Sequence, residues 1–303
     1  MRNIDFRDLT KDDKPVVDKF YRSGYYENSH FNFTNLYMWR KPFQIRTAVE
    51  DDVLFLTCLG EDGALTALQP IGPMERMDDA VARLMEHFGE EGRTLRFSGV
   101  ERSFAEVLEN YGRADFDIWP DRDNFDYVYS SESLMKLAGR KYHSKKNHLN
   151  AFRKMYPQAE YLPITEEIIT LCKLELNSWY KLRSQEEPDD PFIGHERAAI
   201  IEVLNNFQDF GLKGGAIRLD NRIVAFTFGE QLNADTAVIH VEKADPEVRG
   251  AYPAINQGFV EHEWSHLAYI NREEDMGIDG LRKAKESYKP VKMIEKFWAA
   301  RKE

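Results

Sequence analysis

One predicted helix near the middle of the chain is strongly basic and contains no acidic residue. The chain as a whole carries a formal net charge of −11, so this basic segment stands apart from the rest. Its basic residues are Arg140, Lys141, Lys145, Lys146, Arg153 and Lys154. Clustered cations attract phosphate and carboxylate groups, and we predict that Lys145 and Lys146 bind substrate. A solvated helix that balances acidic neighbours is the competing interpretation.

A turn from a strand into a helix is the second candidate for chemistry. The strand ends near Glu242, a helix begins at about Pro253, and Gly250 lies in the loop between them. Backbone N–H groups at a helix N-terminus bind phosphate, and a glycine lets a ligand approach the backbone closely. The residues that we predict to bind a cofactor are Val241, Lys243, Arg249, Gly250, Ala251 and Tyr252. An ordinary strand-to-helix turn would look the same.

A third group of residues combines acidic side chains with a tyrosine. Glu274 is the middle one of three consecutive acidic residues. In the predicted helix that follows, Asp279 and Arg282 lie one turn apart and can form an ion pair, and Tyr288 lies near the helix end. A carboxylate here could bind an amine or accept its proton, and a tyrosine could protonate a leaving group. The alternative is an exposed helix stabilised by ion pairs.

The composition and the missing motifs narrow the function classes. The eight histidines and two cysteines show no metal-ligand spacing, so we expect no metal site and two reduced, buried thiols. Nucleotide-binding glycine loops, the zinc-protease motif and the G-x-S-x-G hydrolase motif are absent. No run of apolar residues exceeds four. We therefore expect no membrane span and no secretory leader. We expect a cytoplasmic globular protein that is not a general nucleic-acid coat.

The order of predicted elements occurs twice along the chain. Each half is predicted to contain two helices, an antiparallel run of three strands, a helix, a strand and a helix. In the second half these are helices 165–179 and 195–210, strands 215–219, 223–231 and 236–242, helix 253–264, strand 266–270 and helix 278–288, with a last strand over 291–297. The predicted fold is α/β, with halves 1–135 and 136–303, each a mixed, mostly antiparallel sheet flanked by helices.

Four segments resemble the soluble C-terminal domain of phosphatidylglycerol lysyltransferases. They are Asn35–Arg40, Phe125–Tyr129, Gly139–Phe152 and Gly280–Pro290. The resemblance implies a tandem pair of GNAT-type (Gcn5-related N-acetyltransferase-like) folds, related to the peptidoglycan aminoacyltransferases. It also implies that the second half carries the donor site.

The resemblance has two departures. The membrane-embedded half of the full-length lysyltransferases is absent here, so a lipid acceptor is not implied. The [Q/R]-x-x-G-x-[G/A] pattern of coenzyme A-binding GNAT enzymes is represented by Glu247, Gly250 and Tyr252, of which only the central glycine fits. Arg249 carries a suitable charge in a different register.

The GNAT resemblance implies roles for the candidate residues. Two strands, ending near Glu242 and Ile270, would splay around the donor carbonyl, and a backbone N–H in the range 241–243 would polarise it. Glu242 or Glu274 would accept the proton of the nucleophile, and Tyr288 would protonate the leaving group. Asp279 and Arg282 would hold the acceptor or an aminoacyl group.

The donor and even the activity remain open at the level of sequence. A coenzyme A thioester is favoured, because an acidic chain is poorly suited to a large polyanion. Aminoacyl-tRNA is the donor that the lysyltransferase resemblance implies, and the basic helix could contact its phosphates. A small-molecule amine or hydroxyl is the expected acceptor. A ligand-binding module without catalysis and a tRNA-docking protein are the alternatives to an acyltransferase.

Overall fold

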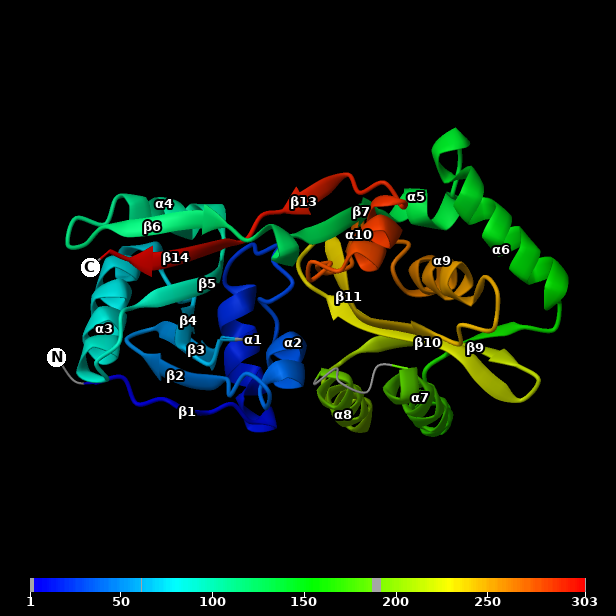
Figure 1. Ribbon diagram of the computed structural model, residues 1–303, viewed down its shortest axis with the longest axis horizontal. Coiled ribbons are helices and arrows are strands. Elements are labelled where there is room, and N and C mark those ends of the chain that lie inside the picture. Colours follow the sequence, from blue (N-terminus) through cyan, green and yellow to red (C-terminus); the bar gives the residue numbers. More distant parts are fainter. Residues whose placement is uncertain (1–2, 61, 187–191, 303) are drawn as a thin grey trace. The chain divides into compact units, whose positions relative to one another are not determined.

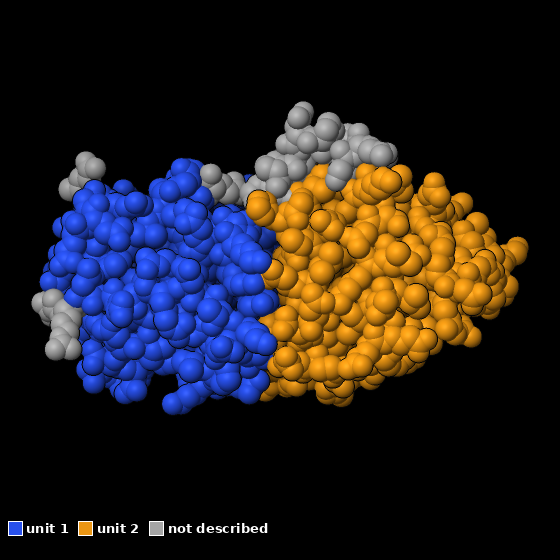
Figure 2. Space-filling view, turned by 90° about the horizontal axis from the view of Figure 1, so that it is seen from below, with its two compact units in different colours: residues 1–126, 294–303 blue, residues 127–293 orange. Residues whose placement is uncertain are grey.

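The structure is a computed structural model that describes residues 3–60, 62–186 and 192–302. The chain forms two compact units, coloured separately in Figure 2. Unit 1 consists of residues 1–126 and 294–303, and unit 2 consists of residues 127–293. The expected boundary near residue 135 therefore lies a few residues too late, and the end of the chain returns to unit 1.

Unit 1 contains a mixed seven-stranded sheet in the order β1-β2-β3-β4-β5-β14-β6. Its strands are β1 (Arg7–Asp8), β2 (Arg46–Glu50), β3 (Val53–Leu59), β4 (Leu65–Leu68), β5 (Arg96–Val100), β6 (Phe116–Pro120) and β14 (Phe297–Arg301). Its helices are α1 (Lys14–Arg22), α2 (Phe33–Trp39), α3 (Met77–Glu90) and α4 (Arg102–Glu109), with short 3-10 turns η1 (Lys11–Asp13), η2 (Met74–Arg76) and η3 (Arg122–Asn124). Among the described residues of this sheet, β4 and β5 pair in parallel and the other neighbouring strands pair antiparallel.

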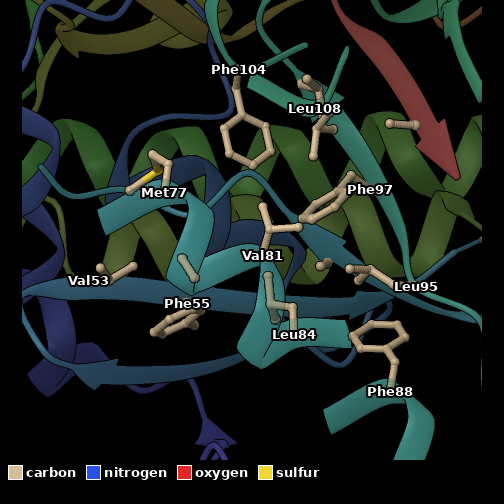
Figure 3. Close-up of a cluster of buried hydrophobic side chains, with 14 of the residues drawn as sticks. Val53, Phe55, Met77, Val81, Leu84, Phe88, Leu95, Phe97, Phe104 and Leu108 are labelled. Atoms are coloured by element: carbon tan, nitrogen blue, oxygen red, sulfur yellow. The ribbon is translucent and has the colours of Figure 1, made fainter. Parts of the chain in front are cut away.

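The core of unit 1 forms where α3 and α4 pack on one face of this sheet. Val81, Leu84 and Phe88 follow helical spacing on α3 and are fully buried. They contact strand residues such as Phe55 and Phe97, as Figure 3 shows. Burial of this apolar face supplies the main driving force for folding of the unit.

Unit 2 repeats the arrangement, with a sheet in the order β13-β7-β12-β11-β10-β9-β8. Its strands are β7 (Asp126–Ser130), β8 (Glu160–Pro163), β9 (Lys213–Leu219), β10 (Arg222–Gln231), β11 (Thr236–Ala244), β12 (Tyr269–Asn271) and β13 (Lys292–Ile294). Its helices are α5 (Ser131–Lys136), α6 (His143–Met155), α7 (Glu166–Glu186), α8 (Phe192–Asn205), α9 (Ala251–Glu263) and α10 (Asp279–Glu286), with the 3-10 turn η4 (Arg140–Tyr142). Helices α7 and α8 cover one face of the sheet, and α9 and α10 lie on the other (Figure 1).

Local sequence explains the turns of unit 2. Asp220 and Asn221 both have positive φ, at 49° and 67°, as a two-residue type I′ hairpin between β9 and β10 requires. Thr165 caps α7, because its hydroxyl accepts the N–H of Ile168 at 3.4 Å. Both signals were present in the sequence, and the elements that they delimit form as expected.

The last strand of the chain belongs to the sheet of unit 1. β14, from the end of the chain, lies between β5 and β6, while β7 lies between β12 and β13. The single strand expected over 291–297 is accordingly two short strands in different sheets. The division falls at Lys296, whose buried ammonium binds Asp126 at 2.7 Å and Ser29 at 3.1 Å, and this anchors the crossing segment in unit 1.

The strands β11 and β12 diverge after a short parallel pairing. Their ladder covers only Thr236–Val238 against Tyr269–Asn271, whereas β11 continues to Ala244. Between β10 and β11 the register shifts, so that His240 is an extra residue in β11. Opposite this bulge, a side chain on Gly229 would meet the carbonyl oxygen of Val238 at 2.0 Å, so only glycine fits.

Candidate functional site

The diverging strand ends of unit 2 are linked by a partly buried ion pair. Glu242 on β11 accepts a hydrogen bond from Nη2 of Arg272 at 2.9 Å, and Arg272 directly follows β12. Its other carboxylate oxygen accepts Nδ2 of Asn256 from α9 at 2.8 Å. The side chains of Glu242 and Arg272 are 12% and 13% exposed, so this pair is largely removed from water.

Tyr288, just after α10, lies between two cations. The Arg272 guanidinium lies 4.9 Å from the centroid of its ring, and the Lys145 ammonium, from α6, lies 4.4 Å from it. Such cation–π contacts stabilise both partners. Tyr288 is 6% exposed, and its hydroxyl makes no hydrogen bond with any residue that the structure describes. Burial raises the pKa of Tyr288 to about 12, against the opposing effect of Arg272, so the phenol is neutral and can donate a proton.

A third cation, Lys285 of α10, completes the group. Its ammonium donates to the backbone carbonyl oxygens of Arg272 and Glu273, the latter at 3.4 Å. Its own carbonyl accepts the hydroxyl of Tyr129 from β7 at 2.8 Å. Burial and the neighbouring Arg272 lower the pKa of Lys285 to about 8. We call Lys145, Glu242, Arg272, Lys285 and Tyr288 the strand-end cluster.

Glu274 lies next to this cluster. Its side chain is partly buried, and its charge acts on Glu273 and on Lys285. Glu242, Tyr288 and Lys145, which were named in three separate segments of the sequence, lie close together in the structure, and the charge of Glu274 acts on Lys285.

Arg282 has a different partner from the one that the sequence suggested. Its guanidinium binds both carboxylate oxygens of Asp275, at 2.9 and 2.8 Å, rather than pairing with Asp279. Asp275 also accepts the hydroxyl of Tyr127 at 2.6 Å. Arg282 and Tyr127 hold the pKa of Asp275 at about 2 despite its burial, and Asp279 is exposed in the first turn of α10. This pair fixes the loop before α10, and only Asp275, which is fully buried, lies within the packed interior.

Lys243 and Val241 face away from the cluster. Neighbouring residues of a strand point to opposite faces, and Lys243 donates to Glu196 of α8 at 2.7 Å, while Glu242 reaches α9. The carbonyl of Val241 accepts the hydroxyl of Thr227 at 2.7 Å. Neither side chain contributes to the group of residues around Tyr288.

The loop before α9 offers few free donors for a phosphate. The N–H groups of Ala251 and Ala254 donate to the carbonyls of Val248 and Gly250, each at 3.1 Å, and Pro253 has none. Gly250, at φ 87°, lies close to α6, since a side chain there would meet the His148 carbonyl oxygen at 2.7 Å. The side chains of Arg249 and Tyr252 are exposed.

Helix α6 packs with one face and exposes most of its cations, whereas Lys145 is half-buried. Leu149 and Phe152 are buried, while Lys146 and Lys154 are exposed. Within the described ranges neither Lys145 nor Lys146 forms an ion pair. Burial lowers the pKa of Lys145, and nearby Arg272 lowers it further.

In unit 1 the corresponding strand end is occupied by the chain itself. The side chain of Asn28 donates to the carbonyl of Gly99 at 3.0 Å, and Gln69 accepts the N–H of Glu101 at 3.0 Å. Glu101 directly follows β5, as Arg272 directly follows β12. Burial raises the pKa of Glu101 to about 7, and no cation cluster surrounds it. The described residues therefore leave unit 2 as the better candidate site.

Residues 23–300 match the family model described as "Phosphatidylglycerol lysyltransferase, C-terminal". The chain belongs to this family. An uncharacterized protein of Mycoplasmoides gallisepticum is 28% identical over 173 residues, which cover 57% of this chain and 54% of that relative. The chain thus spans about half the length of this curated relative.

Solved structures share the fold of this chain. A conserved protein of unknown function from Bacteroides thetaiotaomicron is 37% identical with a TM-score of 0.91, covering 99% of this chain and 100% of that one. The C-terminal domain of a putative lysylphosphatidylglycerol synthetase from Agrobacterium fabrum has a TM-score of 0.66 at 12% identity, and L-PGS from Bacillus licheniformis has 0.63 at 13%. Each of these two alignments covers 95% of this chain and 91% of the other. The expected family and the tandem α/β fold are confirmed.

Within this family member, no described helix has the length and apolarity that a membrane crossing demands. The described residues also include no group of three or more potential metal ligands from histidine, cysteine, aspartate or glutamate.

Several members of the strand-end cluster and its supports were missed at the level of sequence. Arg272, Lys285, Asn256 and Tyr129 were not singled out as site residues. Arg272 had one usable signal, since it directly follows a strand end opposite Glu242. The other contacts join residues far apart in the chain, and no local spacing reveals them.

Proposed function

We propose that this protein transfers an acyl or aminoacyl group from an oxygen ester to an amine or hydroxyl acceptor at the strand-end cluster of unit 2. The observation that carries this proposal is Tyr288, a buried and neutral phenol with a free hydroxyl between Lys145 and Arg272. A phenol in this setting can donate its proton to a departing group, and the two cations stabilise negative charge that develops beside it.

The acidity of Tyr288 favours an oxygen leaving group. Its pKa of about 12 lies roughly three to four units above that of a thiol near 8.5. Proton transfer to a thiolate would therefore be uphill by about 5 kcal/mol, and a thiolate leaves readily without a proton. An alkoxide is a far stronger base, so it both needs and accepts the proton of this phenol.

The loop before α9 uses part of its backbone N–H groups within the chain, which weakens it as a pyrophosphate site. Pyrophosphate binding at a helix N-terminus depends on free backbone N–H groups. Here Ala251 and Ala254 already donate to carbonyls, and Pro253 has no N–H. The coenzyme A expectation from the sequence stays a prediction, with binding at Val241, Lys243 and Arg249–Tyr252.

Aminoacyl-tRNA is the ester that fits the remaining features. Two of the similar solved structures are described as a putative lysylphosphatidylglycerol synthetase and as L-PGS. The family resemblance implies this donor. Lys145 and Lys146 have no carboxylate partners among the described residues and lie on a helix without acids. Such cations can neutralise the backbone phosphates of an RNA end, even on an acidic chain.

The remaining residues take supporting roles in this proposal. Glu242 holds Arg272 in place, because both of its oxygens already accept hydrogen bonds. Glu274 is then the candidate base for the acceptor. Exposed Asp279 is a candidate contact for the acceptor, and Arg282 supports this loop through Asp275.

Ligand-dependent thermal unfolding tests the donor class. The protein is heated with aminoacyl-tRNA, uncharged tRNA, acetyl-coenzyme A or coenzyme A, at low and moderate salt. A ligand at 100 times its Kd adds about 2.7 kcal/mol of stability. We expect a salt-sensitive rise in Tm with aminoacyl-tRNA and none with coenzyme A. A salt-tolerant rise with coenzyme A alone would overturn the proposal in favour of a thioester donor.

A further inference from the structure

A buried histidine lies where the two strands of the candidate site begin to diverge. His240 is the extra residue of the β11 bulge, and its side chain is 1% exposed. Nδ1 lies 2.9 Å from Glu273, and Nε2 lies 3.0 Å from Glu230 of β10. An ionised carboxylate only accepts hydrogen bonds. With Glu230 and Glu273 both ionised, both ring nitrogens donate and the ring is an imidazolium.

These contacts link three segments at the base of the site. The last ladder pair of β11 and β12 is Val238 with Asn271. The His240–Glu273 contact is the next connection beyond it, and the Glu242–Arg272 ion pair follows. The contact with His240 therefore fixes Glu273 at the point where the two strands diverge.

The backbone that Glu273 anchors also positions the cations. Glu273 has φ 58°, an uncommon conformation for a non-glycine residue. Its carbonyl accepts the N–H of Tyr127 at 3.1 Å and the Lys285 ammonium at 3.4 Å. Arg272, one residue earlier, donates its N–H to the Tyr127 carbonyl at 3.0 Å and lies against Tyr288.

We propose that His240, as an imidazolium between Glu230 and Glu273, is a positioning residue that fixes the divergence of β11 and β12. It thereby holds Arg272 beside Tyr288 and keeps the carbonyls of Arg272 and Glu273 in place for Lys285. This inference rests on the proposed function only for its effect on catalysis. The clamp itself is a property of the fold and can be measured without substrate.

The charge balance around His240 supports this assignment. Burial lowers its pKa, but the hydrogen bonds to Glu230 and Glu273 outweigh burial and raise the pKa to about 9. The charges of Glu274 and of Lys285 from α10 act in turn on Glu273. The pKa of His240 in the folded protein lies above its unfolded value near 6.5. The clamp therefore stabilises the folded state fully below about pH 6.5. Its contribution is lost as the pH rises through about 9.

A titration of the unmodified protein gives the first test. Histidine ring nitrogens are followed by NMR on protein labelled with ¹⁵N-histidine, and His240 is assigned by its loss in His240→Gln. We expect both of its nitrogens to be protonated at pH 7.5 and to titrate near pH 9. A neutral imidazole at pH 7.5 would overturn the proposal.

Hydrogen exchange gives the second test. In His240→Gln we expect amides of residues 239–244 and 269–276 to exchange about tenfold to a hundredfold faster, since charge-assisted hydrogen bonds are lost. Exchange in β9 should stay unchanged, as should the whole pattern in the control His262→Gln, an exposed histidine of α9. Unchanged exchange in both segments of His240→Gln would contradict the clamp.

Catalysis separates the clamp from the proposed function. With an active donor, His240→Gln should lower kcat and leave KM for the donor nearly unchanged, and the activity of the unmodified protein should fall above pH 9. If no donor is turned over but the NMR and exchange results hold, the proposed function fails and the clamp stands.

Discussion

At the residue scale, Tyr288 is the group whose chemistry the site exposes. Its hydroxyl has no partner among the described residues, unlike those of Tyr127 and Tyr129, which donate to Asp275 and to the Lys285 carbonyl. The three tyrosines thus divide into two that hold structure and one that is available to substrate. The same division identifies the controls for mutagenesis.

Tyr288→Phe removes the proposed proton donor while keeping the ring between its two cations. We expect kcat to fall about 10²- to 10⁴-fold, as for loss of a general acid, with little change in donor affinity. Single-turnover kinetics and a binding titration measure the two quantities. Tyr269→Phe, on β12 of the same unit, is the matched control, and equal turnover in both variants would remove Tyr288 from the mechanism.

The Glu242–Arg272 ion pair should show strong coupling because it is mostly buried. Removing Glu242 alone leaves a buried, unpaired charge, which costs about 3–5 kcal/mol. We expect Glu242→Leu to be strongly destabilising in urea unfolding and Arg272→Met, added in the same chain, to restore much of the loss. The exposed Glu132–Lys136 pair of α5 is the control, and its expected coupling is much weaker because water screens the two charges. Additive effects at Glu242 and Arg272 would contradict the pairing.

At the element scale, α6 separates substrate binding from packing. Its buried face packs against the rest of unit 2, so its exposed lysines can be substituted without disturbing that packing. We expect Lys146→Glu to leave the Tm unchanged, to weaken tRNA binding, and to lower the slope of log affinity against log salt by about 1 or more. Lys154→Ala is the milder companion variant. A salt slope equal to that of the unmodified protein would show that α6 does not contact RNA.

The elements that could be predicted from sequence are those with strong local signals. The strand predicted over 223–231 forms as β10 (Arg222–Gln231), because turn residues precede an apolar run. The strands β6 and β8 were missed, since each is short and ends in proline, and their pairing partners are distant in the chain. Lys296 lies inside a run that resembles a strand, and only its burial with Asp126 explains why the run divides.

The candidate site was predictable to a similar degree. Glu242 and Tyr288 were found because each lies at the end of a strand or helix, where reactive groups gather in such folds. Arg282 was assigned a partner from helical spacing, but the buried Asp275 outcompetes exposed Asp279 for its guanidinium. His240 gave no sequence signal, because its role depends on a register shift and on two distant carboxylates.

At the scale of the whole molecule, unit 1 depends on the last strand of the chain. β14 lies inside the sheet of unit 1 and contributes Phe297 and Ala299 to its core. We expect a chain truncated after residue 293 to lose the hydrogen-exchange protection of β5 and β6. A chain that lacks only residues 302 and 303 is the control. Native protection of β5 and β6 in the longer truncation would contradict this dependence.

The measurement that tests the account most directly compares one aminoacyl group on two leaving groups. The group is offered as the ester of tRNA and as the thioester of coenzyme A, and its loss is followed in single turnovers with a panel of amine and hydroxyl acceptors. We predict transfer from the ester, abolished in Tyr288→Phe and reduced in His240→Gln, and no transfer from the thioester. Transfer from the thioester that survives Tyr288→Phe would contradict both the oxygen leaving group and the role of Tyr288.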